Sequence, residues 1–141
     1  MKEVLEFLNK NPMGCLATAD GDTPHVRPWG FMCEDGGALW FCTSNRKKVF
    51  EQLMKNPKVE FVTTSREMVT VRISGEISFS KDPVIRKKVF DSNELVKSIY
   101  RSPENPVFEV FCLGHGSISV TNLGSMDTSD MPIMKPRTLT F

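Results

Sequence analysis

FCTSNRKKVFEQL, residues 41–53, contains the junction from which the architecture of this chain can be worked out. An apolar, strand-length run ends in Thr43, Ser44 and Asn45, three cations follow at once, and apolar residues then recur at helical spacing. A helix that begins directly after a strand presents unpaired backbone N–H groups and a partial positive charge at its first turn. The stretch therefore predicts a strand-to-helix turn that can hold an anion such as a phosphate.

The side chains of this turn permit two interpretations. In the first, the hydroxyls of Thr43 and Ser44 donate hydrogen bonds to a phosphate, and Lys47 or Lys48 supplies a point charge. In the second, the residues form an ordinary capped helix with a solvated basic first turn. Cations at a helix N-terminus are mildly unfavourable because of the helix dipole, so three in succession need a separate cause. This segment alone leaves both interpretations open.

Outward from this junction, short strands and turns alternate along the chain. Strand-like runs cover residues 13–19, 24–32, 38–43, 59–64, 68–79, 107–113 and 117–121. Turn signals lie at residues 20–22 and 34–37, a bulge or bend is expected at Gly75, and a hinge at residues 114–116. Helical spacing covers residues 3–10, the residues after Asn45 and a region that starts at Asp82. The pattern predicts a mainly β fold with flanking α-helices, arranged as a small antiparallel barrel.

Length and composition are those of one soluble domain. The chain has 141 residues, of which 40% are hydrophobic and 25% charged. Its net charge of +1 does not indicate a nucleic-acid surface, although it allows small local basic patches. The first turn is acidic, unlike a signal peptide, and no run approaches the ~20 apolar residues of a membrane span. We expect a single cytoplasmic domain over residues 1–141, with an N-terminal helix in 1–12. We also expect an extended tail over 122–141, either disordered or laid across a surface.

The cysteines do not indicate a metal site. Cys15, Cys33, Cys42 and Cys112 form no C-x-x-C pair, and their spacings match no zinc motif. Cys112 and His115 alone fall short of the four ligands that a structural zinc needs. We expect reduced structural thiols.

The second predicted strand carries a further candidate site. Pro28 cannot donate to a sheet ladder, so it marks an edge or a bulge where the backbone is not fully paired. Arg27 and Trp29 beside it suit a planar polar ligand, although an edge strand with a surface arginine and a core tryptophan would give the same pattern. A short turn joins this strand to the next one, which brings Arg27 toward the end at Thr43 and Ser44. Together the two motifs predict a site for a phosphorylated aromatic cofactor.

The ordered set TPHVRPWGF, ALWFCTSNRKKVFEQL, NPKVEF and VTVRISGEI resembles the pyridoxamine 5′-phosphate oxidase-like family, the FMN-binding split-barrel proteins. The resemblance runs from about Met13 to about Thr121. It implies a six-stranded antiparallel split β-barrel, a homodimer, and one FMN at each end of the dimer interface, contacted by both chains.

The resemblance also implies which residues hold the cofactor. Arg27, Pro28 and Trp29 match the strand that runs along the flavin. Thr43 and Ser44 match the phosphate-binding hydroxyls, and Lys47 and Lys48 match the phosphate-binding cations. Thr70 and Arg72 match a strand that approaches the ring.

The sequence departs from the true pyridoxamine phosphate oxidases at its end. Those enzymes close with a segment containing Trp and Arg, whereas the only tryptophans here are Trp29 and Trp40. We therefore expect an FMN-dependent oxidoreductase of another small molecule, with NADH or NADPH as a possible donor. A non-catalytic flavin- or haem-binding sensor or carrier, a deazaflavin in place of FMN, and an empty barrel acting as an interaction domain stay open as alternatives.

No catalytic acid or base can be identified from the sequence. His25 is a candidate proton donor, although a lone histidine is more often a satisfied surface or core residue. His115 lies between two glycines and reads as a turn residue.

Overall fold

The structure is a computed structural model that describes residues 1–123 and 137–141. Eight strands make up one sheet: β1 (Met13–Asp20), β2 (Thr23–Gly30), β3 (Cys33–Asp35), β4 (Ala38–Ser44), β5 (Lys58–Thr64), β6 (Val69–Ser80), β7 (Phe108–Asn122) and β8 (Arg137–Thr140). The described helices are α1 (Lys2–Lys10), α2 (Lys48–Lys55), α3 (Pro83–Asp91) and α4 (Glu94–Tyr100). The mainly β antiparallel fold with flanking helices is confirmed.

The prediction of six strands was wrong, since the described residues contain eight. The sheet runs in the order β2-β1-β5-β6-β7-β4-β3, with β8 added beside β7, and every pair is antiparallel. The extra strands β3 and β8 are three and four residues long, too short to show a period-2 pattern. The two residue runs expected over 107–121 form the single 15-residue strand β7.

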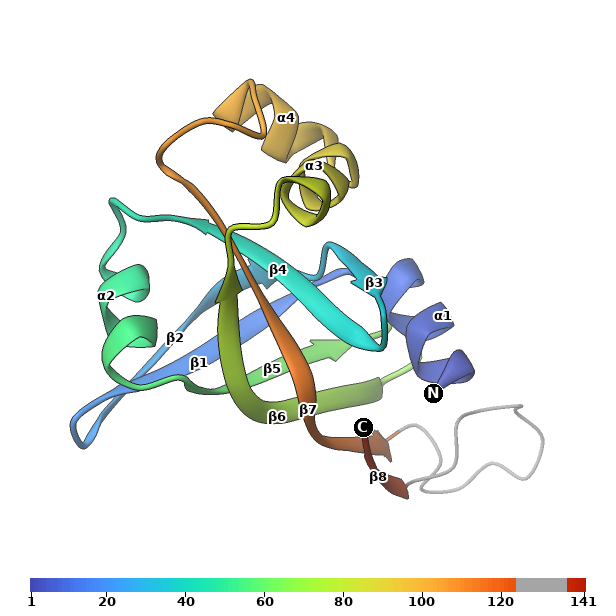
Figure 1. Ribbon diagram of the computed structural model, residues 1–141. Coiled ribbons are helices and arrows are strands. Elements are labelled where there is room, and N and C mark those ends of the chain that lie inside the picture. Colours follow the sequence, from blue (N-terminus) through green and yellow to red (C-terminus); the bar gives the residue numbers. More distant parts are fainter. Residues whose placement is uncertain (124–136) are drawn as a thin grey trace.

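The sheet curls strongly (Figure 1). The strands at the two ends of its order, β2 and β3, follow each other directly in the sequence. Only Phe31 and Met32 separate β2 from β3. Phe31 donates its N–H to the carbonyl of Pro12 at 2.8 Å, and Met32 donates to that of Trp40 at 3.0 Å. The chain therefore leaves the β1 side of the sheet and joins the β4 side within two residues.

Glycines permit the tight turns of the sheet and one close approach between the neighbouring strands β6 and β7. Gly21 has φ 61° in the β1–β2 hairpin, and Gly36 and Gly37 have φ 60° and 85° in the turn before β4, as the turn signals predicted. The register of β6 against β7 shifts between Gly75 and Ile77, which confirms the predicted bulge. A β-carbon on Gly116, opposite this bulge, would lie 2.2 Å from the carbonyl oxygen of Ser74.

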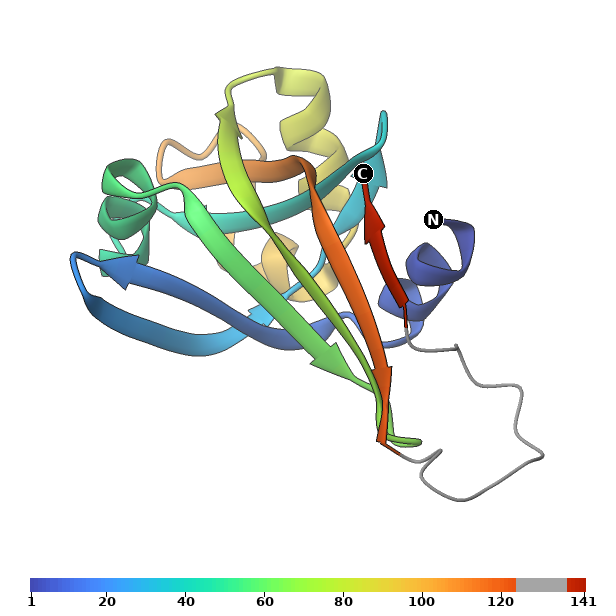
Figure 2. The same ribbon diagram turned by 90° about the horizontal axis from the view of Figure 1, so that it is seen from below.

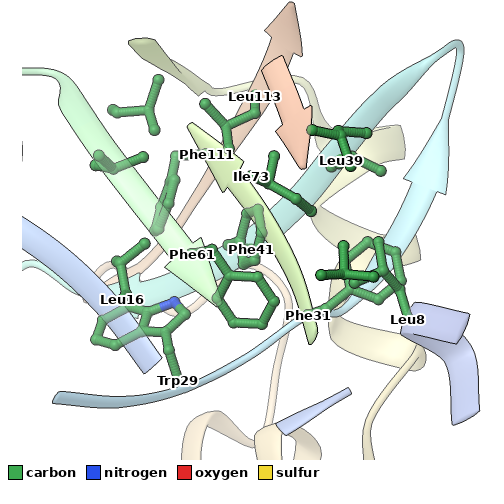
Figure 3. Packing of buried hydrophobic residues seen from close by; sticks show 14 of the residues in the cluster. Leu8, Leu16, Trp29, Phe31, Leu39, Phe41, Phe61, Ile73, Phe111 and Leu113 are labelled. Atoms are coloured by element: carbon green, nitrogen blue, oxygen red, sulfur yellow. The ribbon is translucent and has the colours of Figure 1, made fainter. Parts of the chain in front are cut away.

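Two apolar clusters hold the fold together. The larger one fills the inside of the curled sheet and contains the fully buried Phe41, Phe61 and Phe111 (Figure 3). Phe41 stacks on Phe111 and makes a tilted ring contact with Phe61. The smaller one lies on the other face of β4 and β7, beneath α3 and α4, and includes Phe108 and Tyr100. Helices α3 and α4 pack side by side over this second cluster (Figure 1).

The ends of the helices follow their sequence signals. Asp82 accepts a hydrogen bond from the N–H of Val84 at 2.8 Å and Pro83 is the first residue of α3, as predicted. Of the helices that the structure describes, none is long and apolar enough to cross a membrane.

The described end of the chain lies against the sheet. β8 pairs with residues 117–120 of β7, and the N–H and carbonyl of Phe141 bond to Gly116 (Figure 2). The rest of the predicted tail, residues 124–136, lies outside the described residues.

Candidate functional site

The strand-to-helix junction contains an unpaired polar group. Thr43 faces the inside of the sheet and is 1% exposed. Its hydroxyl is the one buried side-chain polar atom that has no hydrogen-bond partner within residues 1–123 and 137–141. A buried hydroxyl without a partner costs about 1–3 kcal/mol, so its presence points to a partner that is bound from outside the chain.

The N-terminus of α2 follows four residues later and is also unsatisfied. Lys47 occupies the N-cap position and its side chain makes no cap. In the described part of the chain, the N–H groups of Lys48 and Val49 have no hydrogen-bond partner. Ser44 accepts from the N–H of Arg46 at 3.2 Å, which leaves its own O–H free to donate. Two backbone donors, two hydroxyls and two exposed lysines thus lie within residues 43–49.

The prediction that the strand of Arg27 pairs with the strand ending at Thr43 and Ser44 was wrong, because among the described strands β2 pairs with β1, whereas β4 pairs with β3 and β7. Arg27 lies on the inner face of β2 and instead reaches α2, which follows the β4 turn. Its guanidinium donates to the hydroxyl of Thr18 at 2.9 Å and to Oε1 of Gln52 at 2.8 Å, and Thr18 in turn donates to the same Gln52 oxygen. No carboxylate of the described residues forms an ion pair with Arg27, so its positive charge has only neutral partners. Partial burial lowers the pKa of Arg27, but a guanidinium stays charged.

A pocket of about 190 Å³ opens beside this turn. Pro28, Trp29 and Lys47 line it on one side, and residues of α4 close it on the other. The Nζ atom of Lys47 lies 5.9 Å from the centre of the Trp29 ring. Burial raises the pKa of Cys42 and of Tyr100 to about 12 in each case, so both groups in this pocket keep their protons at neutral pH.

Thr70 and Arg72 lie elsewhere, on the outer face of the sheet. Thr70 shares a hydrogen bond of 2.9 Å with Thr64, and Arg72 pairs with Glu60 at 3.1 Å. Arg72 belongs to a row of directly opposed residues across β6, β5, β1 and β2, which are Arg72, Val62, Cys15 and Pro28. Three strand spacings of ~4.8 Å put Pro28 about 14 Å from Arg72 on this face. Within one chain, the predicted residues therefore form two groups rather than one.

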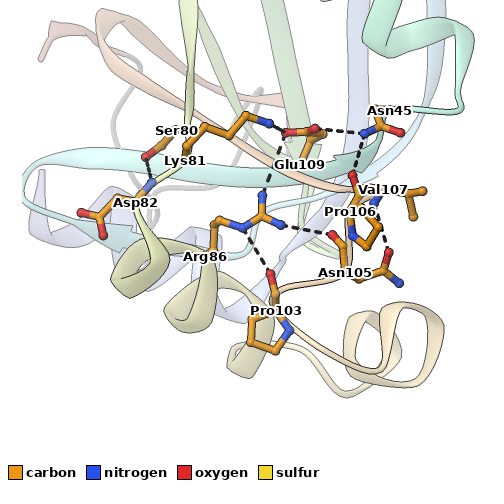
Figure 4. Close-up of polar contacts among 10 residues, drawn as sticks. All are labelled: Asn45, Ser80, Lys81, Asp82, Arg86, Pro103, Asn105, Pro106, Val107 and Glu109. Carbon is orange, nitrogen blue, oxygen red and sulfur yellow. Dashed lines mark hydrogen bonds and ion pairs between the residues drawn. The ribbon is translucent and has the colours of Figure 1, made fainter.

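One polar network beside the junction was missed by the sequence analysis. Glu109 of β7 is buried, accepts from Asn45 at 3.0 Å and from Lys81 at 2.6 Å, and lies 4.0 Å from Arg86 (Figure 4). Asn45 also donates to the carbonyl of Pro106, so the turn between β4 and α2 is tied to the start of β7. A single acidic residue at the start of the apolar run 107–113 was the signal available in the sequence.

The histidines are not part of this junction. His25 is half-buried on β2 opposite Thr18, and His115 is exposed at the bend of β7. All four cysteines are free, and no cluster of three metal-ligating side chains occurs among the residues that the structure describes.

Comparison with known proteins places this chain in a family. The chain belongs to the pyridoxamine 5′-phosphate oxidase family, whose model matches residues 1–114. A NimC/NimA family protein from Clostridium acetobutylicum is 28% identical with a TM-score of 0.85, covering 100% of this chain and 92% of that chain. No curated protein matches the chain.

Two further solved structures share the fold at lower identity. General Stress Protein 26 from Bacillus anthracis is 19% identical with a TM-score of 0.76, covering 99% of this chain and 98% of that chain. A FAD-binding protein from Mesorhizobium loti is 21% identical with a TM-score of 0.57, covering 79% and 86% of the two chains.

Proposed function

We propose that this protein is an FMN-binding flavoprotein of the split-barrel type that acts as a reductase of a small molecule. The observation that carries the proposal is the buried, unpaired hydroxyl of Thr43 beside the uncapped N-terminus of α2. Two free N–H groups, the Ser44 hydroxyl and the exposed side chains of Lys47 and Lys48 complete a donor set that fits a phosphate monoester. Family membership and the FAD-binding neighbour support a flavin as the molecule that bears this phosphate.

Pro28 and Trp29 are proposed to lie along the flavin ring, and Arg27 to supply a cation to it. All three come from the strand next to the phosphate turn, and the charge of Arg27 has only neutral partners among the described residues. The pocket of about 190 Å³ is smaller than the ~300–1,000 Å³ that encloses larger ligands, so one chain alone would not surround FMN. A second chain is needed to cover the rest.

The outer face of the sheet is the surface proposed for that second chain. Met13 and Val26 are 63% and 67% exposed there, next to the exposed Pro24 and Pro28. Exposed apolar side chains that share one face of a sheet suit an interaction surface. A twofold axis between Cys15 and Val62 in the row described above would put Pro28 of one chain opposite the second chain's copy of Arg72. The two groups of predicted residues would then meet across a homodimer interface.

When bound, the flavin would supply the electron-transfer chemistry, with NADH or NADPH as the proposed donor. The residues of this chain bind the phosphate, orient the ring and exclude water from its covered side. Vitamin B6 is not the proposed substrate, because the sequence has no tryptophan after Trp40 to form the closing segment of those oxidases.

The proposal is tested by the visible absorption spectrum after FMN is added and the excess removed by gel filtration. We expect a retained flavin band near one per chain. Lys47→Ala/Lys48→Ala should weaken FMN at least about tenfold, the scale of a lost charge-assisted hydrogen bond to phosphate. The matched control is Lys55→Ala/Lys58→Ala, which removes the same charge at the C-terminal end of α2 and the start of β5 and should leave FMN binding unchanged. Equal retention by both double variants would rule out the phosphate assignment.

A further inference from the structure

Hydrogen bonds join Arg27, Thr18 and Gln52 in a closed ring where α2 packs on the sheet. Gln52 and Thr18 are buried, with 7% and 4% of their surface exposed. Oε1 of Gln52 accepts from Arg27 at 2.8 Å and from Thr18 at 2.7 Å, and the Thr18 hydroxyl accepts from Arg27 at 2.9 Å. A guanidinium can only donate, so the amide of Gln52 must turn its oxygen toward Arg27. The ring therefore holds the arginine in one orientation.

The positive charge of Arg27 is not balanced within this ring. Its acceptors are the Gln52 amide, the Thr18 hydroxyl and, at 3.4 Å, the carbonyl of Leu16, all of which are neutral. The side chain of Arg86 is 12% exposed and shows the contrasting arrangement, because it lies 4.0 Å from the carboxylate of Glu109. A partly buried cation without a carboxylate is left with an unmatched charge, which fits a negatively charged group that comes from outside the chain.

The residue type at position 52 decides whether this charge stays unmatched. Glutamate has nearly the same shape as glutamine and could accept the same two hydrogen bonds, and a charged acceptor makes both of them stronger. The amide N–H₂ of Gln52 donates to no described residue, so a carboxylate oxygen in its place would break no hydrogen bond. Glutamate would thus stabilise the fold more, whereas glutamine gives the same orientation and leaves the charge of Arg27 available.

Helix α2 connects this ring to the phosphate turn. Gln52 is the fifth residue of α2, and the uncapped first turn of the same helix belongs to the proposed phosphate site. The buried side chains of Val49 and Leu53 fix the helix against the core on either side of Gln52. One helix of eight residues therefore sets the position of Arg27 relative to the free N–H groups of the turn.

We propose that Gln52 is a positioning residue, which orients Arg27 and keeps its charge free for the bound cofactor. Thr18 supports the same orientation by donating to Gln52 and accepting from Arg27. The inference rests on the proposed flavin site for the identity of the cofactor. It deepens that proposal by giving a role to a buried side chain that acts on the cofactor only through Arg27.

Gln52→Glu tests the charge. We expect the urea midpoint of the flavin-free protein to rise, because Arg27 gains a carboxylate partner. FMN should bind at least about tenfold more weakly, the scale of one charge-assisted hydrogen bond, because the same carboxylate neutralises the cation. A side chain that served the fold alone would not change stability and affinity in opposite directions. A lower urea midpoint, or unchanged FMN affinity in a fluorescence titration, would overturn the proposal.

Met54→Glu is the matched control for this charge. Met54 is 62% exposed and lies two positions further along α2, on the side of the helix that faces away from Gln52. The variant adds the same negative charge to the same helix and should leave FMN affinity unchanged. An equal loss of affinity in both variants would show that the charge acts from a distance and that Gln52 has no particular role, which would also overturn the proposal.

Gln52→Met separates orientation from charge. Methionine is of similar length but cannot replace the amide oxygen, so Arg27 and Thr18 both lose an acceptor. We expect a lower urea midpoint and FMN binding at least about tenfold weaker. FMN affinity should thus fall in both variants at position 52, while their stabilities change in opposite directions. Undiminished FMN affinity of a folded Gln52→Met protein would contradict the positioning role.

The failure of this inference differs from the failure of the proposed function. Equal FMN affinity of the natural chain and Gln52→Glu contradicts the positioning role and leaves the flavin site standing. A natural chain that retains no FMN, together with a raised urea midpoint in Gln52→Glu, contradicts the flavin site and upholds Gln52 as the residue that holds Arg27 with its charge unmatched.

Discussion

Thr43 gives the sharpest prediction at the scale of a single residue. Thr43→Val keeps the side-chain shape and removes a hydroxyl that has no partner in the described structure. We expect the free energy of unfolding of the flavin-free protein to stay constant or rise by up to about 1 kcal/mol, while FMN retention falls. Urea unfolding and the flavin spectrum measure the two effects.

Thr63→Val is the matched control for this experiment. The Thr63 hydroxyl is buried as well, but it is within 2.8 Å of the carbonyls of both Asn11 and Met13. Its loss should lower the free energy of unfolding by about 1–3 kcal/mol and leave FMN retention unchanged. A Thr43→Val protein as unstable as Thr63→Val would show that the Thr43 hydroxyl has a structural role instead.

The buried thiol of Cys42 should lower the free energy of unfolding at alkaline pH. Burial raises the pKa of its thiol from the ordinary 9.0 to about 12 in the folded chain. Below pH 9 both states hold the proton and nothing changes, but above it the unfolded chain loses the proton while the folded chain keeps it. The free energy of unfolding should therefore fall with rising pH, by up to about 1.4 kcal/mol per unit. Urea unfolding above and below pH 9 checks this, and Cys42→Ala should show a smaller fall than the natural chain.

At the scale of residues, the sequence predicted groups that are consecutive in the chain, but not contacts between distant positions. The junction at Thr43, Ser44, Lys47 and Lys48 could be located because it occupies consecutive positions. The partners of Arg27 could not, because Gln52 is 25 positions away and meets it only once α2 packs on β1 and β2.

At the scale of elements, Glu109 joins four segments. It links the β4–α2 turn through Asn45, the end of β6 through Lys81 and helix α3 through Arg86 (Figure 4). Glu109→Ala leaves the guanidinium of Arg86, which is 12% exposed, without its carboxylate. We expect the free energy of unfolding to fall by about 3–5 kcal/mol.

The control for Glu109 is the surface pair of Arg72 and Glu60. These side chains are 55% and 43% exposed, so Glu60→Ala should cost no more than about 1 kcal/mol. Chemical unfolding of both variants measures the difference. Equal losses would mean that the Glu109 network does not hold the four segments together.

Element prediction succeeded where a pattern extended over several turns or alternations. The helices α1 and α2 and the long strands were found because each is seven residues or longer and repeats apolar residues at a regular period. Strand β3 was read as part of a turn, since its three residues pair with β4 only after the chain has switched sides at Phe31 and Met32.

At the scale of the whole molecule, the outer face of the sheet predicts self-association. Val26→Arg places a charge in the middle of the exposed apolar surface of β1 and β2, where Val26 is 67% exposed. We expect this variant to sediment as a monomer and to lose FMN, whereas Val84→Arg on α3 should do neither. A natural chain that sediments as a monomer and retains FMN would contradict the homodimer model.

The overall class of fold was accessible from the sequence, whereas the pairing of its distant strands was not. Turn signals between short alternating runs indicated an antiparallel β protein, because hairpin pairing is local. The pairing of β4 with β7, and of β1 with β5, depends on contacts between distant segments that no local pattern encodes.

The pairing of Phe41 with Phe111 has a consequence for how the protein is made. β4 leaves the ribosome well before β7, and at roughly 5–20 residues per second the interval lasts several seconds. Throughout that time one edge of β4 lacks its neighbour, and the apolar cluster around Phe41 is incomplete. Long-range antiparallel pairing is also slow once both strands are available. We expect the nascent chain to stay open until synthesis is nearly finished, and to depend on chaperones that shield β4 until then.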